Sequence, residues 1–492
     1  MRQRTNASAI RTVARAIGVS ALVAGTTFAA VAQAGAVQHE GKTAAPAAKA
    51  AKAPKADFNG DGYADTVSSA PKATVGGKEE AGYVTVSYGS AKGASTTHRQ
   101  LFSANTAGVP GDASVNGRFG EQSAARDFDG DGTTDLALTD DGKVLILWGA
   151  KGQTLKAAAA DDGGAEVPGV DSVRTLAAGD FNGDGKADLA VDGNDSGVDL
   201  LYGGFGRDGK PAKTGKVEPG HDFGPDKVIA GDVTGDGIDD LVTTHSFEEM
   251  SEKSAFFKGS KDGLVSKPKA IDDAETGVIA DVNKDGFGDI VLRTVPGGVV
   301  ENLPYDHGTL KVLYGTADGP GTKTSTLTQN SAGVPGANEE GDEFGKSLAA
   351  GDVNGDGYAD IAVGAPYEDI GSGAAGKDAG AVVQLLGGKD GLTGAGAKNW
   401  DQGSEGVPGA VEAEDRFGSA VSLGDTDNDG HDDLAIGADG EDGAGAAAKD
   451  AGSVWVLRGT TSGLTSKGVV SYGPKTLGGP EGNAALGTSF AR

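Results

Sequence analysis

The sequence contains no cysteine, only six histidines and few aromatic side chains, which make up 5% of its 492 residues. Without cysteine there can be no disulfide bond, thiol catalysis or thiolate metal site. Basic side chains are scarce as well, with 43 against 71 acidic ones and a net charge of −28. This charge argues against a nucleic-acid partner, because a phosphate backbone requires a basic surface. Glycine is abundant, with 85 residues, but it does not recur at every third position, which excludes collagen.

The N-terminus has the three parts of an export signal. Arg2, Arg4, Arg11 and Arg15 precede an uncharged stretch at 17–32, which ends in Ala-Gln-Ala at 32–34. We expect residues 1–34 to be a cleaved signal peptide. A retained membrane anchor is the alternative, although a spanning helix needs about 20 apolar residues. Residues 35–56, rich in Ala, Lys and Pro, predict a flexible tether. The chain is therefore expected to be secreted or attached to the cell surface, with no membrane span after signal removal.

From residue 57 onward, one unit recurs seven times, and we call its copies the Asp-rich loops. Each reads Asp-x-Asn/Asp-x-Asp-Gly-x-x-Asp, with threonine at position 3 of the fourth copy, and is followed by an apolar run. Oxygens at positions 1, 3, 5 and 9 and the backbone carbonyl at position 7 can surround one hard cation. The candidate metal ligands are Asp57, Asn59, Asp61, Tyr63 and Asp65; Asp127, Asp129, Asp131, Thr133 and Asp135; Asp180, Asn182, Asp184, Lys186 and Asp188; Asp232, Thr234, Asp236, Ile238 and Asp240; Asp281, Asn283, Asp285, Phe287 and Asp289; Asp352, Asn354, Asp356, Tyr358 and Asp360; and Asp425, Asp427, Asp429, His431 and Asp433.

An all-oxygen set of this size suits Ca²⁺ better than Zn²⁺ or Mg²⁺, so up to seven calcium ions are expected, one per copy. An EF-hand is excluded because position 12 is never Glu and strand-like residues follow. An ordinary Asx turn is the alternative for any single copy, but seven copies that all end in Asp favour a cation. The copy with Thr234 is expected to bind most weakly, and the second and seventh, with four carboxylates each, most strongly. The side chain of His431 is expected to face solvent.

Between the Asp-rich loops the sequence indicates strands only. Short apolar runs such as 83–88 and 144–148 stop at a glycine, and helical periodicity is absent beyond residue 57. Phe-Gly pairs at 119–120, 344–345 and 417–418 each begin eight residues before the first Asp of a loop. These features predict an all-β fold.

The loops and the Phe-Gly pairs resemble the FG-GAP repeat family, the blade unit of integrin alpha-chain N-terminal propellers and of many bacterial surface proteins. The resemblance covers residues 57–492 and implies a seven-bladed β-propeller with calcium in the hairpin after the first strand of each blade. The Phe-Gly pair is missing before Asp180 and Asp281 and displaced before Asp232. Residues 486–492 repeat the segment at 344–350 with no Asp-rich loop after them. We therefore expect the C-terminus to supply the first strand of the blade that continues at Asp57, which closes the ring.

No GxSxG, HExxH or P-loop motif is present, so no catalytic residue is assigned. The sequence favours a non-enzymatic adhesion, recognition or scaffold module, expected to be a monomer that binds an extracellular protein or glycan. The alternative is a secreted, hydrolase-associated FG-GAP protein of phospholipase-like type. Four long segments are expected between the second and third strands of their blades and could form the binding surface, unless they are insertions without function. These segments are 70–82, 293–308, 365–380 and 438–452.

Overall fold

A computed structural model of the chain describes residues 56–156, 164–193, 196–444 and 448–491. The chain divides into two units, Met1–Pro46 and Ala47–Arg492. The first lies outside the described residues, as do the predicted signal peptide and all of the predicted tether except its last residue. All that follows concerns the second unit. Among its described residues, no helix is long and apolar enough to cross a membrane.

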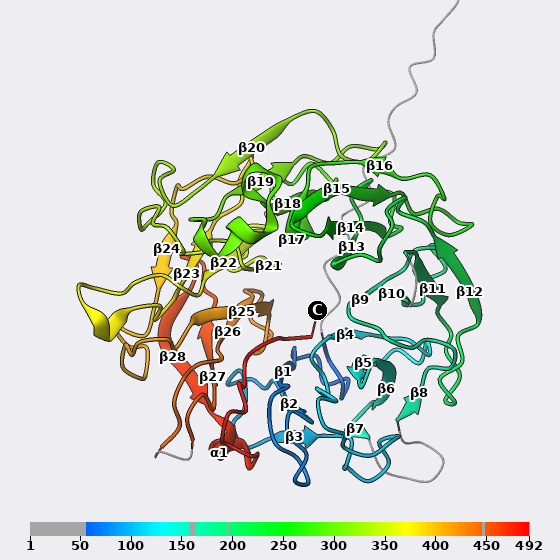
Figure 1. The fold of residues 1–492 in the computed structure, drawn as a ribbon, viewed down its shortest axis with the longest axis horizontal. Coiled ribbons are helices and arrows are strands. Elements are labelled where there is room, and N and C mark those ends of the chain that lie inside the picture. Colours follow the sequence, from blue (N-terminus) through cyan, green and yellow to red (C-terminus); the bar gives the residue numbers. More distant parts are fainter. Residues whose placement is uncertain (1–55, 157–163, 194–195, 445–447, 492) are drawn as a thin grey trace, which may run out of the picture. The chain divides into compact units, whose positions relative to one another are not determined.

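The second unit consists of seven antiparallel sheets set around a ring (Figure 1), which confirms the predicted seven-bladed β-propeller. The blades, in chain order, contain β1 (Thr66–Ala70), β2 (Tyr83–Ser87) and β3 (Arg99–Phe102); β4 (Ser123–Arg126), β5 (Asp135–Asp140), β6 (Lys143–Ala150), β7 (Gln153–Lys156) and β8 (Ala165–Glu166); β9 (Leu176–Gly179), β10 (Asp188–Asp192), β11 (Val198–Tyr202) and β12 (Lys213–Val217); β13 (Lys227–Gly231), β14 (Asp240–Phe247), β15 (Met250–Phe257) and β16 (Lys269–Ala270); β17 (Ala274–Ala280), β18 (Asp289–Thr294), β19 (Leu310–Leu313) and β20 (Thr324–Leu327); β21 (Ser347–Gly351), β22 (Asp360–Ala365), β23 (Ala381–Leu385) and β24 (Lys398–Trp400); and β25 (Phe417–Gly424), β26 (Asp433–Ala438), β27 (Ser453–Arg458) and β28 (Thr465–Tyr472).

Helical turns are few and short. The described residues contain the 3₁₀ helices Pro296–Gly298, Val300–Tyr305 and Ala374–Gly376 and the α-helix α1 (Pro474–Leu477). All four lie in connections between strands or after the last strand.

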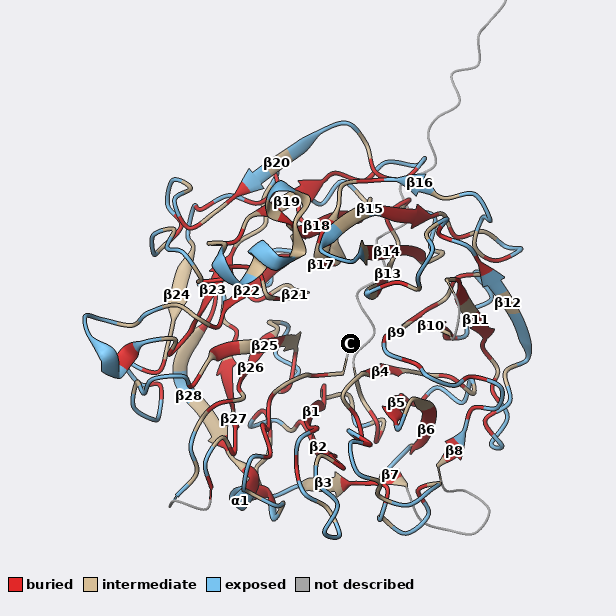
Figure 2. Cartoon of the chain, viewed as in Figure 1, coloured by how far each residue is buried: buried red, intermediate tan, exposed pale blue. Residues whose placement is uncertain are grey.

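Five of the blades run from an inner first strand to a fourth strand at the rim, and their consecutive strands pair as a meander. In the second blade, β8 pairs with β6 in addition to this path. Several first strands are rich in Ala and Gly, as in β9 and β21. Most second and third strands are largely buried, apart from the first half of β15, whereas the rim strands β12 and β20 are mostly exposed (Figure 2). The hydrophobic core lies between neighbouring blades, where for example Ile146 of β6 and Leu189 of β10 share one cluster.

The C-terminal segment closes the ring, as the sequence predicts. It lies beside β1 (Figure 1) and pairs with it antiparallel through Ser68 and Phe490. The amide of Gly487 donates to the carbonyl of Ser69 at 2.9 Å, and the amide of Ser69 donates to the carbonyl of Ser489 at 3.0 Å. Phe490 also packs into a cluster with Tyr83. The first blade is therefore built from both ends of the propeller.

The long segments lie where they were expected, between the second and third strands of four blades. They join β1 to β2, β18 to β19, β22 to β23 and β26 to β27. In contrast, β5 turns into β6 through Asp141 and Gly142, and β14 turns into β15 through Glu248 and Glu249. Because both hairpins of a blade use its second strand, these connections lie at the opposite face of the ring from the Asp-rich loops.

We expect deletion of residues 486–492 to open the ring and to lower Tm strongly, because β1 would become an unpaired edge. Phe490→Ala is a graded version, with an expected loss of about 3 kcal/mol for a buried phenylalanine. Phe223→Ala, at a side chain that is 55% exposed, is the matched control and should leave stability nearly unchanged. Thermal unfolding measures all three, and an unchanged Tm after the deletion would contradict the closure.

Candidate metal centres

Every Asp-rich loop is a hairpin between the first and second strands of a blade. The loop at 127–135 joins β4 to β5, and the loop at 352–360 joins β21 to β22. The loop at 57–65 lies between the C-terminal segment and β1, so it occupies the same position in the first blade. All seven loops therefore lie on one face of the ring.

The first aspartate of each loop folds the chain back on itself. In the second loop, Asp127 Oδ1 accepts hydrogen bonds from the amides of Gly130 at 2.7 Å and Asp131 at 3.2 Å, and its Oδ2 accepts one from Gly132 at 2.8 Å. The bond from the glycine at position 6 recurs in all seven loops at 2.8 to 3.1 Å. This glycine has φ between 82° and 93° in every copy, a conformation that side chains with a Cβ disfavour.

The aspartate at position 9 joins the loop to the third strand of its blade. Asp135 Oδ2 accepts from the amide of Phe128 at 2.9 Å, and its Oδ1 accepts from the amide of Gly149 at 2.8 Å. The bond to the strand-ending glycine is present in all seven blades, at 2.6 to 2.9 Å. A Cβ at these glycines would lie 2.0 to 2.5 Å from the carbonyl oxygen of loop position 8. No other residue fits there.

This role of glycine was missed by the sequence reasoning, which treated the residue only as the end of an apolar run. The sequence signal that could have revealed this role is the recurrence of one glycine at the end of the third strand in every blade. The glycines concerned are Gly89, Gly149, Gly203, Gly259, Gly315, Gly387 and Gly459.

Neighbouring loops are tied to each other by a ring of backbone hydrogen bonds. The amide at position 8 of each loop donates to the carbonyl at position 1 of the preceding loop, as from Thr134 to Asp57 and from Ala187 to Asp127. The bond from Ala64 to Asp425 joins the first loop to the last. All seven distances lie between 2.9 and 3.2 Å. The seven hairpins thus form one connected layer.

The oxygens of the loops fit a hard cation. In the second loop, ligand atoms of Asp127, Asp129 and Asp135 lie within 4.8 Å of one another, and in the seventh so do those of Asp425, Asp427 and Asp429. Thr234 Oγ1 and Asp427 Oδ1, both at position 3, are buried without a hydrogen-bond partner in the part of the chain that the structure describes. An orphaned buried oxygen is costly, and a cation among these oxygens would satisfy it.

Burial leaves the position 9 carboxylates poorly stabilised as anions. It raises the pKa of Asp65 and Asp135 to about 8, an effect increased by the acidic neighbours in the loop and opposed by the two amide donors. The same burial raises the pKa of Asp188, Asp240, Asp289 and Asp360 to about 7 and that of Asp433 to about 6. Without a cation, each loop therefore favours proton uptake.

Two of the loops have an arginine beside their additional carboxylate. Arg207 Nη2 lies 2.7 Å from Asp129 Oδ2 and 3.2 Å from Asp131 Oδ2. Arg458 Nη1 contacts Asp427. These are the second and seventh loops, which have Asp at position 3, and the arginine offsets the charge on which their expected high affinity was based. The arginines follow β11 and end β27, far from the loops in sequence, so no local motif revealed them.

The expectation that His431 faces solvent was wrong. Its side chain is 18% exposed, and Nδ1 lies 2.9 Å from Asp429 Oδ1. A Cβ at Gly355 of the preceding loop would lie 3.0 Å from His431 Nε2. The ring therefore packs between two neighbouring loops, because the loop layer is continuous around the propeller.

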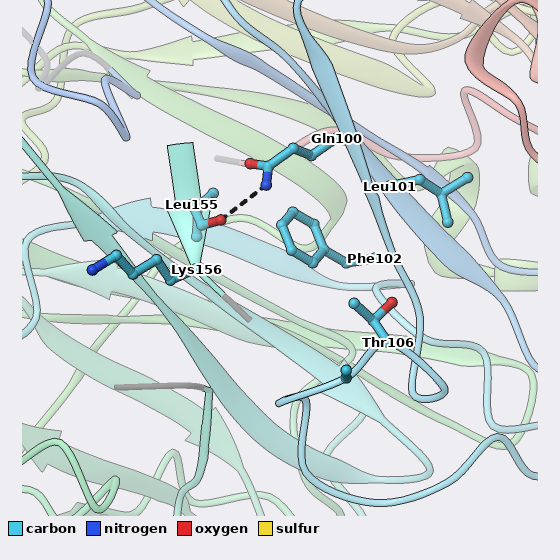
Figure 3. Close-up of a pocket in the computed structure, with 7 residues that line it drawn as sticks. Gln100, Leu101, Phe102, Thr106, Leu155 and Lys156 are labelled. Atoms are coloured by element: carbon cyan, nitrogen blue, oxygen red, sulfur yellow. Dashed lines mark hydrogen bonds between the residues drawn. The ribbon is translucent and has the colours of Figure 1, made fainter. Parts of the chain in front are cut away.

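A hollow of about 350 Å³ lies away from the loops, between β3 and β7 (Figure 3). Its wall includes Gln100, whose Nε2 donates to the carbonyl of Leu155 at 3.0 Å, and Lys156. The lining residues, which are Gln100, Leu101, Phe102, Thr106, Ala107, Leu155 and Lys156, include no carboxylate or histidine. This hollow offers no acid–base pair for catalysis.

Comparison with known proteins agrees with this geometry. Residues 344–383 and 417–457 match the FG-GAP repeat, and residues 127–191 match the FG-GAP-like repeat. The chain is 34% identical over 244 residues to integrin alpha pat-2 of Caenorhabditis briggsae, an alignment that covers 46% of this chain and 18% of the relative. It is 35% identical over 165 residues to integrin alpha-PS5 of Drosophila melanogaster, covering 33% of this chain and 14% of the relative.

A solved Agrocybe aegerita lectin, described as recognising non-reducing terminal N-acetylglucosamine, aligns at 14% identity with a TM-score of 0.44. The alignment covers 86% of this chain and 95% of the lectin. The chain spans less than a fifth of the length of the two integrin relatives. It is a seven-bladed β-propeller that contains FG-GAP and FG-GAP-like repeats at the matched residues. It resembles the N-terminal propeller of integrin alpha chains.

We expect chelation with EDTA to lower Tm markedly and to make stability depend on pH. The position 9 aspartates have folded pKa values raised from 3.8 to about 6 to 8. In the metal-free chain, the stability that they contribute is complete below about pH 4 and is lost as the pH rises through the raised values. Tm in EDTA should therefore fall between about pH 5 and pH 9, and calcium should reverse the fall.

Asp65→Asn is the matched variant, since an amide at this position cannot ionise, and its Tm in EDTA should fall less over the same range. Thermal melts with EDTA and with calcium provide the comparison. A Tm that chelation leaves unchanged would refute the metal sites.

We expect Arg207→Gln to raise the calcium affinity of the second loop, because a competing cation is removed. An exposed ion pair contributes up to about 1 kcal/mol, so the gain should be roughly two- to fivefold. Arg118→Gln is the control, since Arg118 pairs with Glu80 and Glu121 outside the loops. Calorimetric titration with calcium measures both variants. Equal affinities in Arg207→Gln and the control would show that the arginine does not compete.

Proposed function

We propose that the chain is an exported, calcium-stabilised propeller that serves as a non-enzymatic adhesion or recognition module for an extracellular protein or glycan. The similarity to integrin alpha chains supports this class of function. The fit of the Asp-rich loops to a hard cation supports calcium. Export rests on the N-terminal sequence, with cleavage after Ala34 as its expected outcome.

The observation that carries the proposal is the grouping of the four long connections. They belong to the first, fifth, sixth and seventh blades, which are consecutive around the ring because the C-terminal segment closes it. All four lie on the face opposite the Asp-rich loops. A continuous surface is thus built from loops that differ in sequence, on a rigid scaffold, which is a common arrangement for binding sites.

The side chains of these connections suit recognition. Tyr305, between β18 and β19, is 69% exposed, and exposed tyrosines are frequent anchors of protein and glycan interfaces. Asp369 and Asp442 are exposed in the next two connections. A partner with basic or hydrogen-bonding groups would complement this surface.

To test the surface, the connection 366–380 is replaced by an Asn-Gly turn, and Tyr305→Ala is made separately. We expect both changes to reduce binding of the labelled propeller to the surface of the producing cells or to their extracellular matrix. Tyrosine anchors of this kind contribute about 2 kcal/mol or more, so Tyr305→Ala should weaken binding roughly thirtyfold.

The matched control is Lys389→Ala/Asp390→Ala, which changes two exposed side chains in the connection from β23 to β24, at the opposite end of the same blade. Its Tm and its binding should both stay close to those of the parent protein. If binding were undiminished after replacement of 366–380, this face would not be the binding surface.

A further inference from the structure

Two neighbouring blade junctions contain the same set of acidic and amide side chains, which we call the junction clusters. The first lies where β20 leads into the blade of β21–β24, and the second where β24 leads into the blade of β25–β28. The first cluster consists of Gln329, Glu339, Asp342, Glu368 and Asp369, and the second of Gln402, Glu412, Asp415, Glu441 and Asp442. Both lie outside the Asp-rich loops.

In the first cluster, one hydrogen bond joins two parts of the chain, and a second lies within the segment 339–342. Gln329 Nε2 donates to Glu368 Oε2 at 2.5 Å, which links the end of one blade to the β22–β23 connection of the next. The amide of Glu339 donates to Asp342 Oδ2 at 2.8 Å. Asp342 is 2% exposed, whereas Glu339 lies at the surface. The cluster thus combines one buried aspartate with a half-buried glutamate and two exposed acids.

The second cluster repeats this arrangement. Gln402 Nε2 donates to Glu441 Oε2 at 2.5 Å, and the amide of Glu412 donates to Asp415 Oδ2 at 3.2 Å. Asp415 is 2% exposed, and Glu412 is exposed. The same bonds and the same pattern of burial therefore occur twice in the molecule.

Each cluster also contains an orphaned carbonyl oxygen. Gln329 and Gln402 are each 3% exposed, and their Oε1 atoms are buried with no hydrogen-bond partner within the described ranges. Because each Nε2 is held by a glutamate of its cluster, the amide group lies among the acids. A buried acceptor without a donor is unfavourable. A cation is one ligand that carbonyl and carboxylate oxygens can bind together.

The charged groups that lie near the buried aspartates of the clusters include several further acids. Burial raises the pKa of Asp342 to about 7, and the charged neighbours that add to the effect, Glu368, Glu339 and Asp369, are all acidic. In the second cluster, Asp415 and Glu441 hydrogen-bond to each other, and burial raises the pKa of Asp415 to about 6 and that of Glu441 to about 7, although hydrogen bonds from Gln402 oppose both shifts. A positive charge at either position would relieve this repulsion.

A third junction, after β3, has the same turn without the cluster. The amide of Thr106 donates to the carbonyl of Ser103 and that of Val109 to Thr106, as Ser331 and Val334 do in the first cluster. Yet Ala104, Ser114 and Gly117 occupy the positions of the glutamine, the exposed glutamate and the buried aspartate.

The β5–β6 turn of that blade, Asp141-Gly142, is also too short to carry a residue equivalent to Glu368. The glutamine, the buried aspartate and both glutamates of the cluster are thus absent together. The turn itself does not require them, so their presence at the other two junctions needs another explanation.

We propose that each junction cluster binds one calcium ion, in addition to any ions in the Asp-rich loops. The ligands are the glutamine Oε1 and the carboxylates of the buried aspartate and the glutamate, with the exposed glutamate at the entrance. An all-oxygen set from three separate segments suits Ca²⁺, which accepts flexible geometry. The ion links two adjacent blades and holds the β22–β23 or β26–β27 connection in place.

The test compares charge-removing variants in the full-length protein. Asp342→Asn/Glu368→Gln alters the first cluster and Asp415→Asn/Glu441→Gln the second. Asp112→Asn/Asp141→Asn, which changes two exposed acids at the third junction, is the matched control. Calcium bound per chain at saturation is measured by equilibrium dialysis and atomic emission. We expect one ion fewer for each cluster variant, two fewer for the combined variant and no change for the control.

Thermal melts provide a second readout that detects damage to the fold. In EDTA the cluster variants should melt no lower than the parent, because amides remove repulsion, but calcium should raise their Tm by less. Unchanged stoichiometry in the combined variant, or a calcium-induced rise equal to that of the control, would overturn the proposal. The Asp-rich loops are intact in all variants, so their binding is assessed separately in the parent protein.

Discussion

The buried carboxylate that ends each Asp-rich loop joins three parts of its blade. Asp135 accepts from the loop amide of Phe128 and from the amide of Gly149, where the third strand ends. The position before it, Thr134, donates to the preceding loop. A single aspartate therefore fixes the loop and the register of the second and third strands, and the residue before it makes the contact to the preceding blade. Repeated around the ring, this linkage makes the propeller a closed structure rather than a row of sheets.

That linkage has a cost that metal binding would offset. A carboxylate that is almost fully buried pays a large desolvation penalty, which two backbone donors compensate only in part. The part of this penalty that the two donors do not compensate raises the pKa of Asp65 and Asp135. The first, third and fifth residues of the same loop add further negative charge nearby. The proposed calcium coordination and structural stability would thus be two aspects of one arrangement, which would also account for much of the acidic composition of the chain.

The sequence predicted the features that repeat locally. Nine consecutive residues define each loop, so its place between the first and second strands followed, and so did the number of blades. The ring closure followed from the match of residues 486–492 to 344–350. Residues distant in sequence were not predictable, because no local pattern records their contacts. Arg207 and Arg458 reach their loops only in the folded chain. The junction clusters likewise combine a strand end, a connecting segment and a hairpin.

The two faces of the ring have different physical roles. On one face, short loops of almost uniform sequence are tied together by backbone bonds, which leaves little freedom for variation. On the other, hairpin length ranges from the two-residue turn at Asp141-Gly142 to the long connection between β22 and β23. Long surface loops cost little free energy to extend, but they bind weakly unless they are held in place. A cation at each junction cluster would hold two of them against the neighbouring blade, so the variable face would gain the order that recognition requires.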